Sequence, residues 1–167
     1  PIAAAMALGW LALPPDILID RDAKNVAVRA ADGRLAVVSG RRARFTATEW
    51  LERDGDERAV AASARAGREG VWTCEDKLCV ARVRGLDVGY MERAGSGARA
   101  CAAGLDIVIA AREIEPCAQG LTLTAADVAR DGAMALYIAP DGTVSIDTVR
   151  RHIGERRWTV WSGEGEL

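Results

Sequence analysis

The sequence contains very little histidine and very little phenylalanine. Its 167 residues include a single histidine, His152, and a single phenylalanine, Phe45. One histidine is too few for a multi-histidine zinc site. Because His152 stands between Arg151 and Ile153, it is predicted to be a surface residue rather than a general base. The Gly-x-Ser-x-Gly, Gly-x-x-x-x-Gly-Lys and His-Glu-x-x-His patterns are also absent. The sequence therefore predicts neither a catalytic site nor a cofactor.

A strong excess of charge of either sign is absent as well. Lysine and arginine total 22 against 24 aspartate and glutamate residues, which gives a net charge of −2. This balance produces no overall field that would attract nucleic acid, so any contact with DNA has to be local. Two arginine clusters are the candidates for such a contact, and a solvated basic face is the alternative interpretation. The clusters are Arg41, Arg42 and Arg44, and Arg150, Arg151, Arg156 and Arg157.

No uncharged run in the sequence is long enough to span a bilayer. The first charged residue is Asp16, but the run before the Pro14-Pro15 pair holds only 13 residues, about 20 Å of helix. We interpret residues 1–15 as the end of a transmembrane helix and a linker, with Trp10 near the membrane interface. A buried or disordered leader is the alternative.

The remaining sequence predicts a single α+β domain at residues 16–154, followed by a tail at residues 155–167. Short apolar runs separated by turns indicate a β-rich mixed sheet with a few short helices. One helix is predicted from a Thr46–Glu49 capping box to Arg53, and another from Thr124 to about Asp131. Residues 57–70 are predicted to be either a weak helix or a mobile excursion. The predicted strands are a meander over residues 17–38, a hairpin over 71–83, a strand at 86–91, a buried strand at 105–110 and a hairpin over 134–149.

Three polar residues in the first meander superficially suggest a calcium loop. Asp20, Asp22 and Asn25 do not follow the alternating-oxygen spacing of such loops, and the glycine that would follow is missing. We therefore expect them to be solvated turn residues.

Four cysteines allow three disulfide pairings. The spacing favours Cys74–Cys79, across the predicted hairpin, together with Cys101–Cys117, around the buried strand. Free thiols and a zinc site are the alternatives, although the spacing lacks the short paired knuckles of zinc sites. Two disulfides would indicate an oxidising compartment such as the periplasm.

Four segments in matching order carry a resemblance to a known family. They are PDILIDRDAKNVAVRAADGRLAVV, WTCEDKLCVA, CAAGLDIVIA, and GAMALYI followed by VSIDTVRRHIGERRW. Together they resemble the C-terminal region of ComEC competence proteins of the alphaproteobacterial type. The resemblance implies a domain of an inner-membrane channel that passes transforming single-stranded DNA. The implied partners are this DNA, the rest of the channel and other competence proteins, and the implied location of the domain is the periplasm.

In many members of that family the C-terminal region is a metallo-β-lactamase-like domain, for which a nuclease role is proposed. This sequence departs from that pattern. The residues after DIVIA read AREIEPC where the active form would carry His-His-Gly-Ser, and one histidine cannot supply the ligand set. We therefore expect a degenerate relative that lacks the metal site.

Three functions remain open from the sequence. The first is a non-catalytic domain that guides single-stranded DNA through the two arginine clusters, with tryptophans available for base stacking. The second is a disulfide-stabilised structural or protein-interaction domain without DNA contact. The third is a divergent metal-dependent nuclease.

Overall fold

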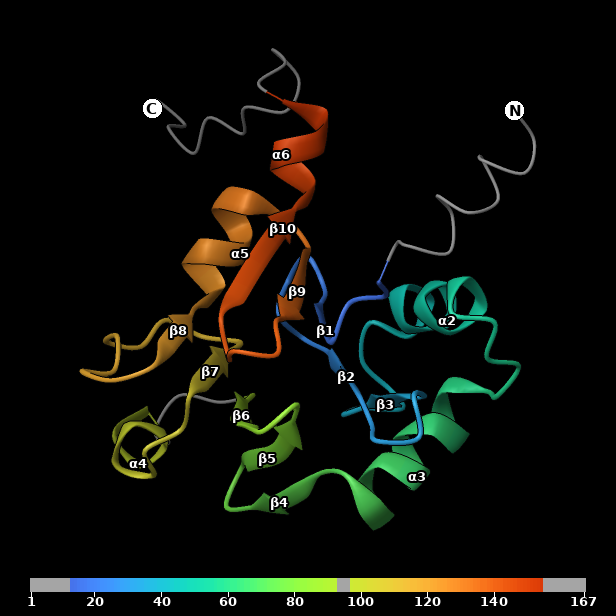
Figure 1. Cartoon of the computed structure of the whole chain (residues 1–167), viewed down its shortest axis with the longest axis horizontal. Coiled ribbons are helices and arrows are strands. Elements are labelled where there is room, and N and C mark those ends of the chain that lie inside the picture. Colours follow the sequence, from blue (N-terminus) through green and yellow to red (C-terminus); the bar gives the residue numbers. More distant parts are fainter. Residues whose placement is uncertain (1–12, 93–96, 155–167) are drawn as a thin grey trace, which may run out of the picture.

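The computed structural model describes residues 13–92 and 97–154 (Figure 1). These residues form two five-stranded sheets with short helices around them. The α+β class expected from the sequence is confirmed, but the strands form two sheets rather than one mixed sheet. Residues 1–12 of the predicted transmembrane end and linker (residues 1–15) lie outside the described residues, as does the predicted tail at 155–167.

The first sheet joins the two ends of the described chain. Its strand order is β10-β9-β1-β2-β3, and every pairing is antiparallel. Ile17 lies opposite Val28 on one side and Leu136 on the other, so the C-terminal hairpin extends the N-terminal meander. The strands are β1 (Ile17–Ile19), β2 (Val26–Arg29), β3 (Leu35–Val37), β9 (Met134–Ile138) and β10 (Val144–Thr148).

The second sheet has the order β4-β5-β6-β7-β8. Its first three strands are antiparallel, whereas β7 is parallel to both of its neighbours. All four residues of β7 are buried, as expected for the continuous apolar run that the sequence shows there. The strands are β4 (Thr73–Glu75), β5 (Leu78–Val83), β6 (Leu86–Met91), β7 (Ile107–Ala110) and β8 (Leu121–Leu123).

The two sheets pack face to face around the main core. Ile17 and Ile19 of the first sheet belong to one buried cluster with Val88, Ile107 and Ile109 of the second. Alternate residues of β2 and β3 point the other way, and the helices α2 and α3 cover them. The helix α4 covers the outer face of the second sheet, where Ala100 packs with Met91 and Val108. The layers therefore run helix, sheet, sheet, helix.

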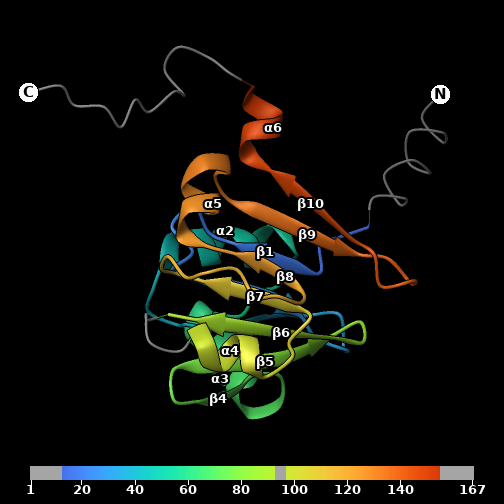
Figure 2. The same cartoon turned by 90° about the vertical axis from the view of Figure 1, so that its left-hand side faces the viewer.

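Five short helices connect the strands of the described chain. They are α2 (Arg44–Arg53), α3 (Val60–Gly70), α4 (Gly97–Ala102), α5 (Ala125–Asp131) and α6 (Val149–Ile153). In both views α6 lies at the top of the molecule and α3 near the bottom (Figures 1 and 2). Within residues 13–92 and 97–154, no helix combines the length and apolar character that a membrane crossing needs.

Helix starts agree with the sequence in one case and differ in another. The predicted start at Thr124 is confirmed, because Thr124 and Asp127 form a reciprocal capping box at α5. The predicted capping box at Thr46 and Glu49 is wrong, because α2 begins earlier, after Ala43 in a left-handed conformation (φ 40°). Thr46 therefore lies within the first turn, where its side chain cannot cap the helix.

Candidate anion-binding groove

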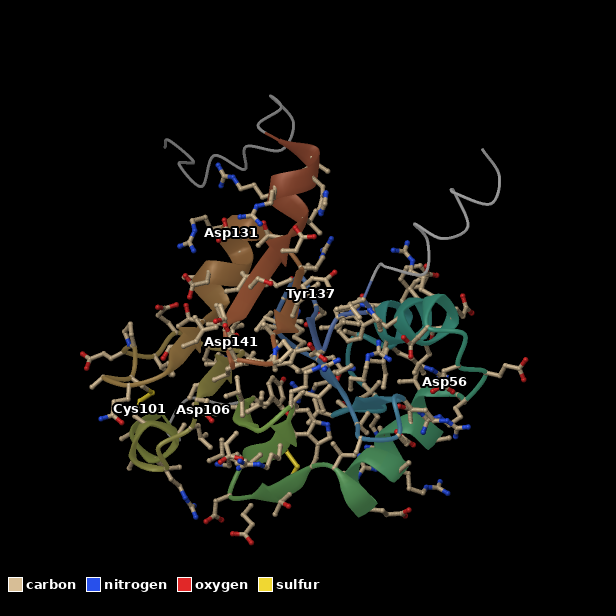
Figure 3. The ribbon with its side chains drawn as sticks, in the orientation of Figure 1. Asp56, Cys101, Asp106, Asp131, Tyr137 and Asp141 are labelled. Atoms are coloured by element: carbon tan, nitrogen blue, oxygen red, sulfur yellow. A yellow bond between two sulfur atoms is a disulfide. The ribbon has the colours of Figure 1, made fainter. Side chains whose placement is uncertain are left out.

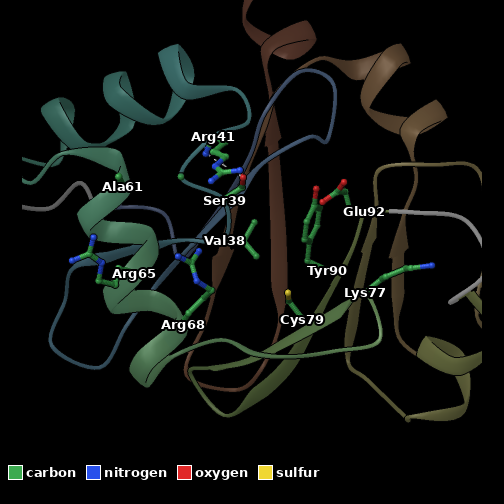
Figure 4. Close-up of a pocket in the computed structure, with 11 residues that line it drawn as sticks. Val38, Ser39, Arg41, Ala61, Arg65, Arg68, Lys77, Cys79, Tyr90 and Glu92 are labelled. Atoms are coloured by element: carbon green, nitrogen blue, oxygen red, sulfur yellow. Dashed lines mark hydrogen bonds between the residues drawn. The ribbon is translucent and has the colours of Figure 1, made fainter.

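A groove of about 610 Å³ opens between three parts of the chain (Figure 4). One wall is the end of β3 with the loop that leads into α2, another is α3, and the third is the β4–β5 hairpin with the end of β6. Four cationic side chains line it, namely Arg41, Arg65, Arg68 and Lys77.

The helix α3 places two of these cations because its opposite face is packed against β3. Ser63 is fully buried and donates a hydrogen bond from Oγ to the carbonyl oxygen of Leu35 at 2.8 Å. Gly67 allows α3 to approach β3 closely, because a Cβ atom at this position would lie 3.3 Å from the carbonyl oxygen of Val37. Arg65 and Arg68 are three positions apart, so they lie on one face of the helix, beside the groove.

Asn25 holds the loop that carries Arg41. It is completely buried, and its Nδ2 donates hydrogen bonds to the carbonyl oxygens of Ser39 (2.9 Å) and Arg42 (2.7 Å). Its Oδ1 accepts from the amides of Val26 and Ser39, both at 3.1 Å. One side chain thus ties the start of β2 to both ends of the Ser39–Arg42 loop.

The prediction that Asp20, Asp22 and Asn25 are solvated turn residues is wrong for two of the three. Asp22 is exposed, but Asp20 is only 2% exposed and Asn25 is fully buried. Burial raises the pKa of Asp20, while hydrogen bonds from neighbouring backbone amides, including that of Asn25, act in the opposite direction. These polar residues build the scaffold of the groove wall because the turn packs into the protein interior.

The third wall depends on the Cys74–Cys79 disulfide. The two cysteines lie directly opposite each other in the register of β4 and β5, with 4.0 Å between their Cα atoms. Lys77 lies in the turn between them, in a left-handed conformation (φ 73°), and both Lys77 and Cys79 line the groove. Asp76 of the same turn forms an ion pair with Arg99 of α4. The hairpin is therefore anchored to the second sheet and to α4.

The groove contains one acidic residue and one buried phenol. Glu92 forms an ion pair with Arg42, which links the β3–α2 loop to the end of β6. Tyr90 is 4% exposed, and its hydroxyl donates a hydrogen bond to the carbonyl oxygen of Ala23 at 3.2 Å. Burial raises the pKa of Tyr90, so the phenol stays neutral at physiological pH.

The charge balance of the groove favours an anionic ligand. Among the described residues, none of the four lining cations has a side-chain hydrogen bond or an ion pair with another side chain. Arginine offers planar bidentate donors to phosphate or carboxylate groups, and lysine offers a compact charge. The arrangement can bind several anionic groups in a row, but it presents no nucleophile beside a free base.

The structure separates the two predicted arginine clusters. Arg41 lines the groove and Arg42 pairs with Glu92 at its side, whereas Arg44 is an exposed residue at the start of α2. Arg150 and Arg151 lie on α6, which Figures 1 and 2 both place at the opposite end of the molecule from α3. Arg156 and Arg157 lie outside the described residues.

Sequence reasoning missed three of the four lining cations. Arg65 and Arg68 were within reach, because a spacing of three in a segment with helical potential predicts a shared face. That segment is an 11-residue helix, the first of the two alternatives considered for residues 57–70. Lys77 carries no comparable signal, since only the fold of the hairpin brings it to the groove.

The described tryptophans do not offer free faces for base stacking. Trp72 is 2% exposed and donates from Nε1 to the carbonyl oxygen of Ala36 at 3.0 Å. Trp50 is half-buried against the cluster beneath α2. Trp10, Trp158 and Trp161 lie outside the described residues.

All four cysteines form disulfides in the pairs that the spacing favours. The Cys101–Cys117 bond connects α4 to the segment after β7, with 5.1 Å between the Cα atoms (Figure 3). His152 is exposed, and its Nε2 lies 2.8 Å from Oδ2 of Asp147. This hydrogen bond lowers the pKa of the Asp147 carboxyl. Within the described ranges, no three His, Cys, Asp or Glu side chains are placed to bind a metal together.

Comparisons with protein-family models, with curated proteins and with solved structures find no match to this chain.

Proposed function

We propose that this chain is a non-catalytic C-terminal domain of a ComEC-type DNA-uptake channel. In this proposal the basic groove holds the sugar-phosphate backbone of the transforming single strand. The observation that carries the DNA contact is the set of four cations that line one groove from three separate parts of the chain, where Glu92 is the one carboxylate among the described lining residues. The channel assignment is supported by the sequence segments that resemble the ComEC C-terminal region.

The chemistry of the groove suits a polyanion better than a single small anion. The cations are spread over the β3–α2 loop, α3 and the β4–β5 turn, so they face a volume of about 610 Å³ from several sides. A single strand presents one phosphate per nucleotide, and each neutralised phosphate releases condensed counterions. Affinity should therefore fall steeply as the salt concentration rises.

Two further observations support the remaining parts of the proposal. The helix–sheet–sheet–helix layering suits a degenerate metallo-β-lactamase-like sandwich. Two disulfides suit an oxidising compartment, so we place the domain on the periplasmic side of the inner membrane. The rest of the channel and other competence proteins are its proposed partners.

Charge reversal at the groove tests the DNA contact. We expect Arg65→Glu together with Arg68→Glu to weaken binding of a short fluorescent oligo(dT) by at least about tenfold, because two attractive contacts become repulsive. The salt dependence should become shallower by about 1.4, from two phosphate contacts at roughly 0.7 each on a single strand. Fluorescence anisotropy over a salt series measures both quantities.

The matched control reverses the same number of charges at the other end of the molecule. Arg150→Glu with Arg151→Glu should leave the affinity and the salt slope close to those of the unchanged protein. Equal losses in the two double variants, or an affinity that does not respond to salt, would contradict the proposed groove.

A structural or protein-interaction role is the second candidate. It is favoured by an apolar groove of about 510 Å³ beside the N-terminal segment, lined by Leu13, Pro14, Trp50 and Val149 among others. Leu13 there is 73% exposed. Flat DNA titrations of a folded protein that still captures a channel or pilus component would favour this function over the first.

A further inference from the structure

The single phenylalanine of the chain lies on the surface. Phe45 is the second residue of α2, and its exposed fraction is 80%. The residues of α2 that pack on the first sheet are Ala47 and Leu51, with Trp50 partly buried beside them. Phe45 is absent from that cluster, so the fold gains little from its ring.

The position of Phe45 is more informative than its exposure, since single exposed apolar residues are common. It follows Arg41 by four residues, at the point where the groove-lining loop becomes helix. That loop is held by Asn25 and by the Arg42–Glu92 ion pair. Phe45 therefore follows directly in the chain on a fixed loop that lines the basic groove, and its ring is exposed.

The other described aromatic side chains cannot serve in this way. Tyr90 and Trp72 are buried, and Trp50 packs beneath α2. Tyr137 is partly buried on β9, in the other part of the first sheet. Phe45 is the one aromatic residue within the described ranges whose side chain is exposed.

We propose that Phe45 is the base-stacking contact of the groove and makes it select single-stranded DNA. This inference rests on the proposed function, in which the groove binds the backbone. A strand held by its phosphates in the groove can place an adjacent base on the ring, and such stacking tolerates any base because each has a π-face. In a duplex the neighbouring base pairs cover the base faces, and a polyanion without bases has no such faces. Neither ligand can therefore stack on the ring.

An abasic oligonucleotide separates stacking from charge. It carries the same phosphates as oligo(dT) of equal length but no bases, so only stacking distinguishes the two ligands. We expect the unchanged protein to bind oligo(dT) more tightly than the abasic strand. Phe45→Ala should lose about tenfold in affinity for oligo(dT), equivalent to about 1.4 kcal/mol, and nothing for the abasic strand, because only the strand with bases can stack on the ring.

Two further variants serve as controls for this experiment. Phe45→Trp should restore the preference for oligo(dT), because a larger aromatic face replaces the ring. Ile153→Ala removes another exposed apolar side chain, on α6, and should change neither affinity. Circular dichroism should show all three variants folded, since Phe45 packs against little.

The outcomes distinguish this inference from the proposed function. Charge reversal at Arg65 and Arg68 that weakens binding, with Phe45→Ala without effect, would overturn the stacking contact and leave the groove in place. Equal weakening of both ligands by Phe45→Ala would also overturn it, because the ring would then act on the backbone site. Absence of any DNA binding by the unchanged protein would overturn both.

Discussion

Asp16 and Arg84 form an ion pair between the two sheets, although 68 positions separate them in the sequence. The Nε of Arg84, in the β5–β6 turn, lies 2.5 Å from Oδ1 of Asp16, whose side chain is 5% exposed. The other carboxylate oxygen accepts the amide of Ile138 on β9 at 2.8 Å. Asp16 therefore connects the start of β1 to β9 and to the β5–β6 turn, at the point where the described chain enters the first sheet.

Removing the charge of Arg84 should destabilise the domain. Arg84→Met keeps most of the aliphatic stem but leaves the buried Asp16 carboxylate with one partner fewer, so we expect a loss of about 2 kcal/mol in the free energy of unfolding. Urea denaturation followed by tryptophan fluorescence measures the change. Arg82→Met is the control, because the Arg82–Asp87 pair is 68% and 42% exposed and should contribute less than about 1 kcal/mol. Equal losses in the two variants would argue against the bridging role of Asp16.

Asn25 should be essential for the groove although it does not line it. Asn25→Ala leaves the carbonyl oxygens of Ser39 and Arg42 without their buried donor, at an expected cost of about 3 kcal/mol of unfolding free energy. The same variant should weaken oligo(dT) binding at temperatures where it remains folded, because the loop carrying Arg41 loses its anchor. Asp32→Ala, which removes an exposed turn contact to the Arg34 amide, serves as the control. An Asn25→Ala variant with the same free energy of unfolding as the unchanged protein would contradict the role of Asn25 in holding this loop.

The raised pKa of Asp20 makes a prediction about pH. A carboxyl whose folded-state pKa lies above its unfolded value binds its proton more tightly when folded. Its contribution to stability is therefore complete below the ordinary value of 3.8 and is lost as the pH rises through the folded-state pKa. Asp20→Asn removes this titration, so the stability of the variant relative to the unchanged protein should increase as the pH rises from about 4 to 8. Urea unfolding at several pH values measures the difference, and a difference that stays constant with pH would contradict the prediction.

Local patterns were enough for the elements that depend on neighbouring residues. Alternating and continuous apolar runs predicted the strands that became β6, β7, β9 and β10, because side-chain periodicity follows from backbone geometry. Thr124 and Asp127 predicted the start of α5, since a capping box involves only four successive residues.

Local patterns failed where a distant part of the chain decided the outcome. Thr46 and Glu49 have the spacing of a capping box, but the helix starts at Arg44 because Asn25, in the turn before β2, fixes the preceding loop. Asp20 and Asn25 look like solvated turn residues, yet their turn packs into the interior beside Tyr90. The division of the strands into two sheets also depends on long-range pairing, such as that of β1 with β9.

The sequence by itself determined the class of the fold, most of its strands and the two favoured cysteine pairs, because these follow from periodicity and spacing along the chain. The groove was decided by the tertiary structure alone. Arg41, Arg65 and Lys77 belong to a loop, a helix and a hairpin turn, and they line one groove only because β3 and β4 both pack against α3. The sequence likewise shows that phenylalanine is scarce, but only the packing of α2 leaves Phe45 exposed.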